Sequence, residues 1–139
     1  MSALTREDAG PEAEELIRRI ETADVLILGS PIYRASYTGA LKHLFDLVHY
    51  QALVGAVAVI AATGGTPLHG LAVEHQFRPL LSYFGIVAVP TTIYALETDF
   101  TGFELTNNAI RDRVARAADE VALLARSGLR HHRATAAAA

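Results

Sequence analysis

The sequence predicts an α/β fold in which helices cover both faces of a parallel sheet. Amphipathic segments and short apolar segments alternate along the chain in the order αβαβαβα. The apolar segments are nearly continuous, which is typical of strands buried on both faces of a parallel sheet. A length of 139 residues, 51% of them hydrophobic, suits one domain with its own core.

The first helix is predicted over residues 11–22. Pro11 suits a first helical turn, and apolar residues recur on one face at Leu16, Ile17 and Ile20. The unbroken apolar run 25–28 then predicts a strand that ends at Gly29. This strand is expected to be buried on both faces.

The next helix and strand repeat this pattern. Segment 36–50 carries apolar residues at helical spacing, namely Leu41, Leu44, Phe45 and Val48. A second buried strand is predicted over 56–62, and Thr63-Gly64-Gly65 follows it.

The last part of the chain predicts helix, strand and helix again. A helix over about 68–84 is expected to bend at Pro79, which lacks an amide N–H. The strand predicted over 87–94 contains Pro90, which indicates an edge position or a bulge. The final helix is predicted to begin near Thr106-Asn107, with an apolar stripe at Ile110, Val114, Ala117, Val121 and Leu124.

Composition excludes several classes of protein. The net charge is −3 and no basic stripe is visible, which argues against a nucleic-acid partner. The absence of cysteine excludes disulfides and thiolate catalysis. No apolar run approaches the roughly 20 residues of a membrane span, and Met1 to Gly10 lack the apolar region of a signal peptide. We expect a cytoplasmic protein with one domain over 1–127 and a disordered tail over 128–139.

Two unusual loops follow the first two predicted strands. Parallel sheets bind ligands outside the carboxyl ends of their strands, where these loops lie. Pro31 is expected to leave the amides of Ile32 and Tyr33 free to face a ligand. Gly64 and Gly65 lack a Cβ, so a flat heteroaromatic ring could approach the backbone closely.

These loops resemble signatures of a known family. The matching segments are Gly29 to Lys42, then Ala62 to Thr66 with His69 and Arg78 to Leu81, and the stretch from Val89-Pro90-Thr91 through Asp99-Phe100. Over about residues 11–124 the chain resembles the NADPH-dependent FMN reductase family. It is most similar to the flavin reductases of two-component monooxygenase systems.

The resemblance implies a flavodoxin-like fold that binds FMN and uses NAD(P)H as co-substrate. By carry-over, two groups of residues cradle the flavin ring: Ser30, Pro31, Ile32, Tyr33 and Arg34 in one loop, and Thr63, Gly64 and Gly65 in the other. Hydride passes from the nicotinamide to flavin N5, so no acid–base catalyst and no metal site is nominated. Arg34 either attracts the phosphates of FMN or NADPH or is a solvated surface residue.

The expected function is reduction of FMN by NADPH or NADH, with reduced flavin supplied to a partner oxygenase. A quinone, azo or chromate reductase is the alternative among enzymes. A non-catalytic subunit that keeps only the oligomer interface is the alternative outside them. A homodimer or homotetramer is expected, with Phe45, His49, His75 and Tyr83 near the contact.

The chain departs from the family at its N-terminal side. Family members begin with a βαβ unit whose first loop binds the FMN phosphate, and Met1 to Gly10 contain no such strand or loop. The strand 25–28 is therefore expected to become a sheet edge, and the chain to bind FMN weakly and to associate. Truncation, completion by another chain and degeneration remain alternative explanations.

Overall fold

A computed structural model of the chain describes residues 5–127, so the tail predicted over 128–139 lies outside the described residues. A parallel sheet forms its centre, in which β2 (Val57–Gly64) pairs with β1 (Val25–Pro31) on one side and with β3 (Val87–Ala88) and β4 (Ile93–Leu96) on the other. The α/β class and the parallel sheet are confirmed.

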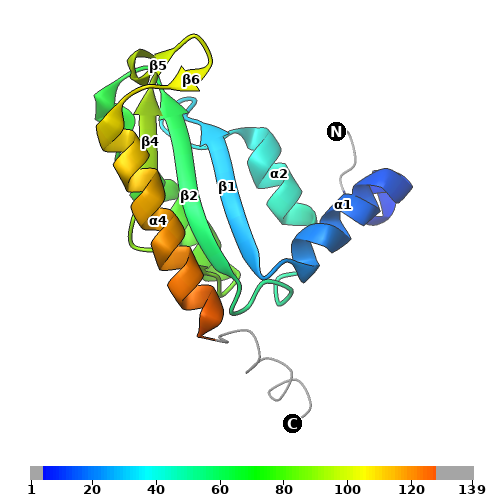
Figure 1. Cartoon of the computed structure of the whole chain (residues 1–139). Helices are drawn as coiled ribbons and strands as arrows, with labels where there is room; N and C mark the ends of the chain where they lie inside the picture. The colour runs from blue at the N-terminus through cyan, green and yellow to red at the C-terminus, as the bar shows by residue number, and fades with distance from the viewer. Residues whose placement is uncertain (1–4, 128–139) are drawn as a thin grey trace.

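Helices pack on both faces of this sheet, as predicted (Figure 1). The side chains of β2 alternate between two clusters. Ala58, Ile60 and Ala62 join a core that includes residues of α1 (Gly10–Thr22), α2 (Gly39–Leu47) and α3 (Arg78–Tyr83). Val57 and Val59 pack on the opposite face against Ala117 of α4 (Asn108–Arg126). Among residues 5–127, no helix combines the length and the apolar character needed to cross a membrane.

Local capping residues begin two of the helices: α4 begins where the sequence predicted, and α2 lies inside the predicted segment 36–50 but is shorter. The Thr38 hydroxyl accepts a hydrogen bond from the amide of Leu41 at the start of α2. The Asn107 side chain accepts one from the amide of Ala109 at the start of α4. Both are N-cap bonds that satisfy amides left unpaired in a first helical turn.

The third predicted strand is divided, which confirms a bulge at Pro90. Val57 and Ala58 pair with Val87 and Ala88, and Ala61 pairs with Ile93. Between these pairs β2 has two residues, 59 and 60, whereas the neighbouring segment has four, 89–92, and the two extra residues form the bulge.

The continuous helix predicted over 68–84 is wrong. The segment is a 3₁₀ turn (Pro67–His69), a π-helical turn (Val73–Phe77) and then α3. The π-helical turn and α3 are continuous, and Pro79 is the second residue after the change of helix type, so the residue without an N–H lies where the regular α-helical bonding begins.

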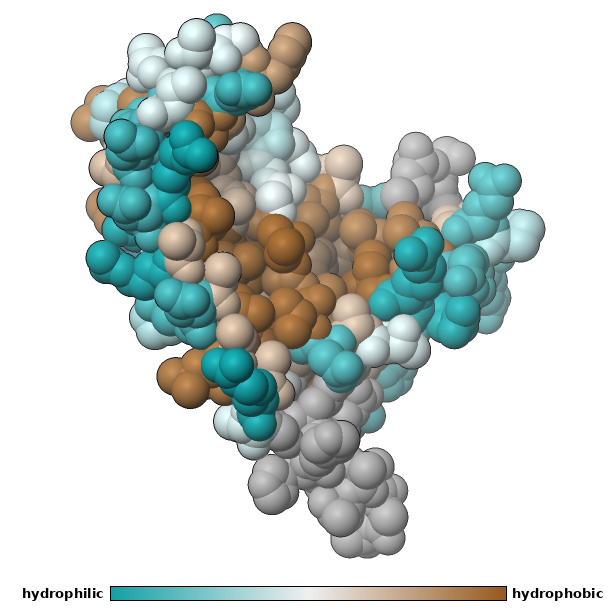
Figure 2. All heavy atoms as spheres, viewed as in Figure 1, coloured by the Kyte–Doolittle hydropathy of each residue, from teal (hydrophilic) through white to brown (hydrophobic). Residues whose placement is uncertain are grey.

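The prediction that β1 is buried on both faces is also wrong. Leu28 and Ser30 are buried, but the side chain of Ile27 is 79% exposed on the other face. Figure 2 shows apolar residues gathered in a hollow over β1 and β2, between the polar outer surfaces of α4 and α1. Within the described residues β1 pairs with β2 only, so it is an edge strand, as the resemblance predicted.

Candidate functional site

The carboxyl ends of β1, β2 and β4 meet at one edge of the sheet, and a cavity of about 340 Å³ lies there. It contains six of the eight residues predicted for the site. Its lining residues are Pro31, Ile32, Tyr33, Thr63, Gly64, Gly65, Glu97 and Phe100. The register explains this convergence, because Pro31 pairs with Thr63 and Leu96 pairs with Gly64.

The remaining two predicted residues, Ser30 and Arg34, do not line this cavity. Ser30 is buried below the loop that follows β1, where its hydroxyl accepts a hydrogen bond from the amide of Thr38 at 3.0 Å. It also donates to the carbonyl of Pro31 at 2.9 Å. Arg34 is exposed in the turn that follows Tyr33. Ser30 therefore shapes the loop and also lines an adjoining cavity, whereas Arg34 lines neither of the two cavities.

The prediction of free amides at Ile32 and Tyr33 is wrong. The amide of Ile32 donates to the carbonyl of Thr63 at 2.7 Å, and the amide of Tyr33 donates to the carbonyl of Ser36 at 2.9 Å. Sequence reasoning missed these bonds because the Thr63 carbonyl is placed by the pairing of β1 with β2, and the Ser36 carbonyl only when the loop folds back on itself. The two loops of the site are consequently tied to each other through Ile32 and Thr63.

The two adjacent glycines differ in their surroundings. A Cβ added at Gly65 would meet no heavy atom within 4 Å. A Cβ added at Gly64 would lie 2.0 Å from the hydroxyl oxygen of Tyr94. The sequence predicted an open backbone at both glycines. It is present at Gly65, whereas at Gly64 the side chain of Tyr94 from β4 occupies the space that a Cβ would need.

A short hairpin supplies two lining residues that sequence reasoning missed. After β4 the chain forms a 3₁₀ turn (Glu97–Asp99), then β5 (Phe100–Thr101) and β6 (Glu104–Leu105), which pair antiparallel. Glu97 and Phe100 line the cavity from this segment. The sequence could have indicated both residues, because they follow the third predicted strand and the carboxyl end of that strand lies at the same edge of the sheet.

The Asp99 carboxylate holds this segment in place. It accepts hydrogen bonds from the amide of Leu96 at 2.7 Å and from the side chain of Asn107 at 2.6 Å. These bonds hold the pKa of Asp99 below its ordinary value, the bond from the Leu96 amide contributing most. Asp99 thus joins the end of β4 to the start of α4 and fixes the position of Phe100.

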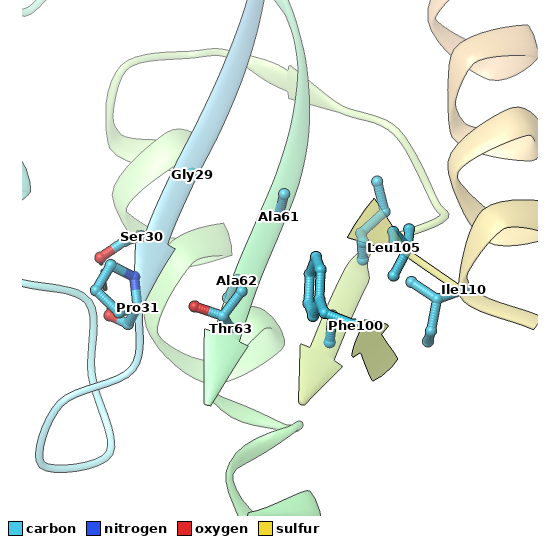
Figure 3. Close-up of a pocket in the computed structure, with 11 residues that line it drawn as sticks. Gly29, Ser30, Pro31, Ala61, Ala62, Thr63, Phe100, Leu105 and Ile110 are labelled. Carbon is cyan, nitrogen blue, oxygen red and sulfur yellow. Dashed lines mark hydrogen bonds between the residues drawn. The ribbon is translucent and has the colours of Figure 1, made fainter. Parts of the chain in front are cut away.

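A second cavity of about 310 Å³ adjoins the first, and Pro31, Thr63 and Phe100 line both. Figure 3 shows Pro31 and Phe100 on either side of Thr63, with Leu105 and Ile110 beyond Phe100. The two cavities together form a largely apolar cleft, and the backbone of Gly64 and Gly65 is part of its wall. Among the described residues that line the first cavity, Glu97 is the charged one. Such a lining suits a largely apolar group better than a highly charged one.

Comparisons with known proteins identify the family of the chain. A family model described as NADPH-dependent FMN reductase matches residues 2–101. The chain is 43% identical over 123 residues to the NADH-dependent FMN reductase SfnF of Pseudomonas fluorescens, covering 88% of this chain and 66% of the relative. The chain therefore spans just under two thirds of the length of that relative.

Solved structures show the same fold. A crystal structure of an oxidoreductase from Corynebacterium diphtheriae superposes with a TM-score of 0.77 at 39% identity, covering 85% of this chain and 64% of that one. A flavodoxin, the WrbA-like protein of Agrobacterium tumefaciens, superposes with a TM-score of 0.62 at 17% identity, covering 82% of this chain and 73% of that one, and shows that the fold is flavodoxin-like. With the family match and the identity to SfnF, the chain belongs to the NADPH-dependent FMN reductase family.

Proposed function

We propose that the cavity beside Gly65 binds the isoalloxazine ring of FMN and that the chain takes part in reduction of FMN by NADH or NADPH. The open backbone at Gly65 carries this proposal, because a flat ring can contact the main chain there without meeting a side chain. The cavity of about 340 Å³ falls within the roughly 300–1,000 Å³ of small-molecule sites. The residues present therefore fit an isoalloxazine ring.

The protein's part in this reaction is to bind and orient. FMN supplies the hydride chemistry when it is bound. Tyr33 and Phe100 lie in the cavity walls on different segments, and Ile32 is buried below them. Reduced flavin is then passed to a partner oxygenase. The proposal keeps both NADH and NADPH as hydride donors, because the family description names NADPH and the name of the relative SfnF names NADH.

A substitution at Gly65 tests the placement of the ring. Gly65→Val puts a branched side chain into the cavity, whereas Gly39→Val makes the same change at an exposed position of α2 where a Cβ meets no atom within 4 Å. We expect Gly65→Val to weaken FMN binding by roughly tenfold or more, or about 1.4 kcal/mol. Gly39→Val should bind FMN as the unaltered chain does. Titration by flavin fluorescence quenching measures both, and an unchanged affinity in Gly65→Val refutes the placement.

The activity has a separate test. A yellow purified protein that oxidises NADH or NADPH with FMN as acceptor supports the flavin reductase. Oxidation that requires a quinone, an azo dye or chromate supports the alternative acceptors instead. A colourless protein that does not bind added FMN supports a non-catalytic subunit.

We further propose that a second copy of the chain docks between α2 and α3. A depression of about 490 Å³ lies there, and Phe45, His49 and Tyr83 are among its lining residues. Tyr83 is 70% exposed, Phe45 is buried, and His75 does not line the depression.

Light scattering should show a dimer or tetramer that Tyr83→Glu dissociates and that Leu123→Glu, an exposed position on α4, leaves intact. A monomer at micromolar concentration contradicts this.

A further inference from the structure

Tyr94 of β4 lies against the loop that carries the two glycines. Its hydroxyl donates a hydrogen bond of 2.7 Å to the carbonyl of Thr66. Its ring contacts the positions of Gly64 and Gly70, where added Cβ atoms would lie 2.8 and 3.5 Å from ring carbons. Tyr94 is absent from the residues that line the cavity. It therefore contacts the loop from the side away from the proposed ligand.

The contact with Tyr94 explains why Gly64 is a glycine. A Cβ there would lie 2.0 Å from the tyrosine hydroxyl oxygen, a separation that non-bonded atoms do not adopt. At Gly65 the same addition meets nothing. Gly64 thus makes room for Tyr94, and Gly65 leaves open the space in which the proposed ligand would lie.

The loop is held at both of its ends. At one end the carbonyl of Thr63 accepts a hydrogen bond from the amide of Ile32 at 2.7 Å. At the other end the carbonyl of Thr66 accepts from Tyr94 at 2.7 Å and from the amide of His69 at 3.3 Å. Gly64 is the last residue of β2 and pairs with Leu96, so Gly65 is the residue that lies between the end of the strand and the Thr66 carbonyl.

We propose that Tyr94 is a positioning residue for flavin binding, which fixes the Thr66 end of the loop so that the Gly65 backbone keeps the position against which the ring binds. The inference rests on the proposed function. Burial raises the pKa of the Tyr94 phenol above its ordinary value, so the hydroxyl remains a donor at neutral and mildly alkaline pH. A tyrosine that only fills space would affect the stability of the fold and leave the ligand's surroundings unchanged.

Tyr94→Phe removes the hydroxyl and keeps the ring. Its matched control is Thr91→Val, which removes another part-buried hydroxyl bond, to Glu120 at 2.7 Å, at a residue that lines neither cavity of the candidate site. We expect Tyr94→Phe to weaken FMN binding by roughly three- to tenfold, the effect of losing one hydrogen bond. It should also change the visible circular dichroism of bound flavin. Thr91→Val should lose comparable stability in urea and keep both the affinity and the spectrum.

A coupling measurement tests the contact without FMN. Gly64→Ala should destabilise the unaltered chain in urea more than the Tyr94→Phe chain, because without the hydroxyl the nearest atom to the added Cβ is a ring carbon at 2.8 Å and no longer an oxygen at 2.0 Å. Equal costs in both backgrounds overturn the inference.

The FMN titration separates the two proposals. If the unaltered chain binds FMN and Tyr94→Phe binds it equally well with the same spectrum, the inference is overturned and the proposed function stands. If Thr91→Val loses affinity as much as Tyr94→Phe, affinity follows stability and the inference is again overturned. An unaltered chain that does not quench FMN overturns the proposed function and this inference with it.

Discussion

Arg34 and Ala35 hold left-handed backbone conformations, with φ of 53° and 65°. They are the central residues of a turn in which Tyr33 and Ser36 exchange two backbone hydrogen bonds, of 2.9 and 3.1 Å. Turns of this kind favour Asn-Gly, because a residue with a Cβ costs about 1–2 kcal/mol in the left-handed region. The strain lies in the loop that lines the candidate site, as is common where a backbone shape is needed for binding.

Ala35→Gly should relieve part of this strain. We expect a gain in stability of roughly 0.5–1 kcal/mol, since Ala at positive φ costs more than the extra chain entropy of Gly. Ala118→Gly, at an exposed position inside α4, should instead lose about 1 kcal/mol. Urea denaturation of the two variants checks the difference in sign, and a loss in both contradicts the interpretation of the turn.

Arg34 is a predicted site residue that does not line the cavity, so its role has to be tested separately. If its guanidinium attracts the FMN phosphate, Arg34→Ala should weaken FMN binding and leave riboflavin binding unchanged. Because the attraction is between exposed charges, the difference should shrink as salt is raised. Paired titrations of FMN and riboflavin at low and high salt measure this. Equal effects on both flavins would place Arg34 on the solvated surface instead.

At the scale of the elements, the two edges of the sheet differ. Arg78 donates to the carbonyls of Val89 and Pro90, at 3.1 and 3.0 Å, and Arg113 donates twice to the carbonyl of Thr92, at 3.0 and 2.7 Å. These arginines, with the bulge, close the β3–β4 edge to further strands. The outer edge of β1 carries no such device among the described residues, and it is seven residues long.

The closed edge should also be sensitive to acid. The Glu120 carboxylate accepts hydrogen bonds from the amide and hydroxyl of Thr91, and these lower the pKa of Glu120, the amide contributing most. A lowered folded-state pKa adds stability above the ordinary pKa of the carboxyl, and this stability is lost as pH falls through the folded value. Glu120→Gln should therefore reduce the fall in the urea midpoint between pH 7 and pH 4. Asp119→Asn, on the exposed face of α4, should keep the full fall, and an equal slope in both would exclude Glu120 as the cause.

For the whole molecule, the hollow over β1 and β2 is the main exposed apolar surface in the view of Figure 2. Val25 and Ile27 contribute exposed side chains on β1, whose outer edge pairs with no strand within residues 5–127. A second chain or segment can pair with such an edge and cover such a face at once. We expect association through β1 in addition to any specific contact between α2 and α3.

Ile27→Lys should reduce this association. A lysine on an edge strand opposes further pairing, and at a side chain that is 79% exposed it should change stability by no more than about 0.5 kcal/mol. Leu123→Lys, which adds the same charge on α4, should leave association unchanged. Light scattering over a range of concentrations, with urea denaturation alongside, gives both readings. Equal effects of the two lysines would mean that net charge, and not the β1 edge, controls association.

The sequence by itself determined the features that depend on neighbouring residues. Alternating apolar runs and amphipathic segments predicted the parallel α/β class, because the side chains that a helix or strand buries recur in the sequence with the period of that element. Pro90 indicated the bulge, and Asn107 the start of α4, since each acts on the backbone beside it. Six of the eight predicted site residues lie in one cavity, because successive parallel strands end at the same edge.

Only the tertiary structure decided what depends on distant residues. The roles of Gly64 and Gly65 separate because Tyr94, about thirty positions later, fills the space beside one of them. Phe100 became a cavity wall because Asp99 joins β4 to α4, and the face of β1 is open because the described chain places no helix over Ile27. Local propensity and period carry no information about such contacts, since their energies come from side chains that meet only after the chain has folded.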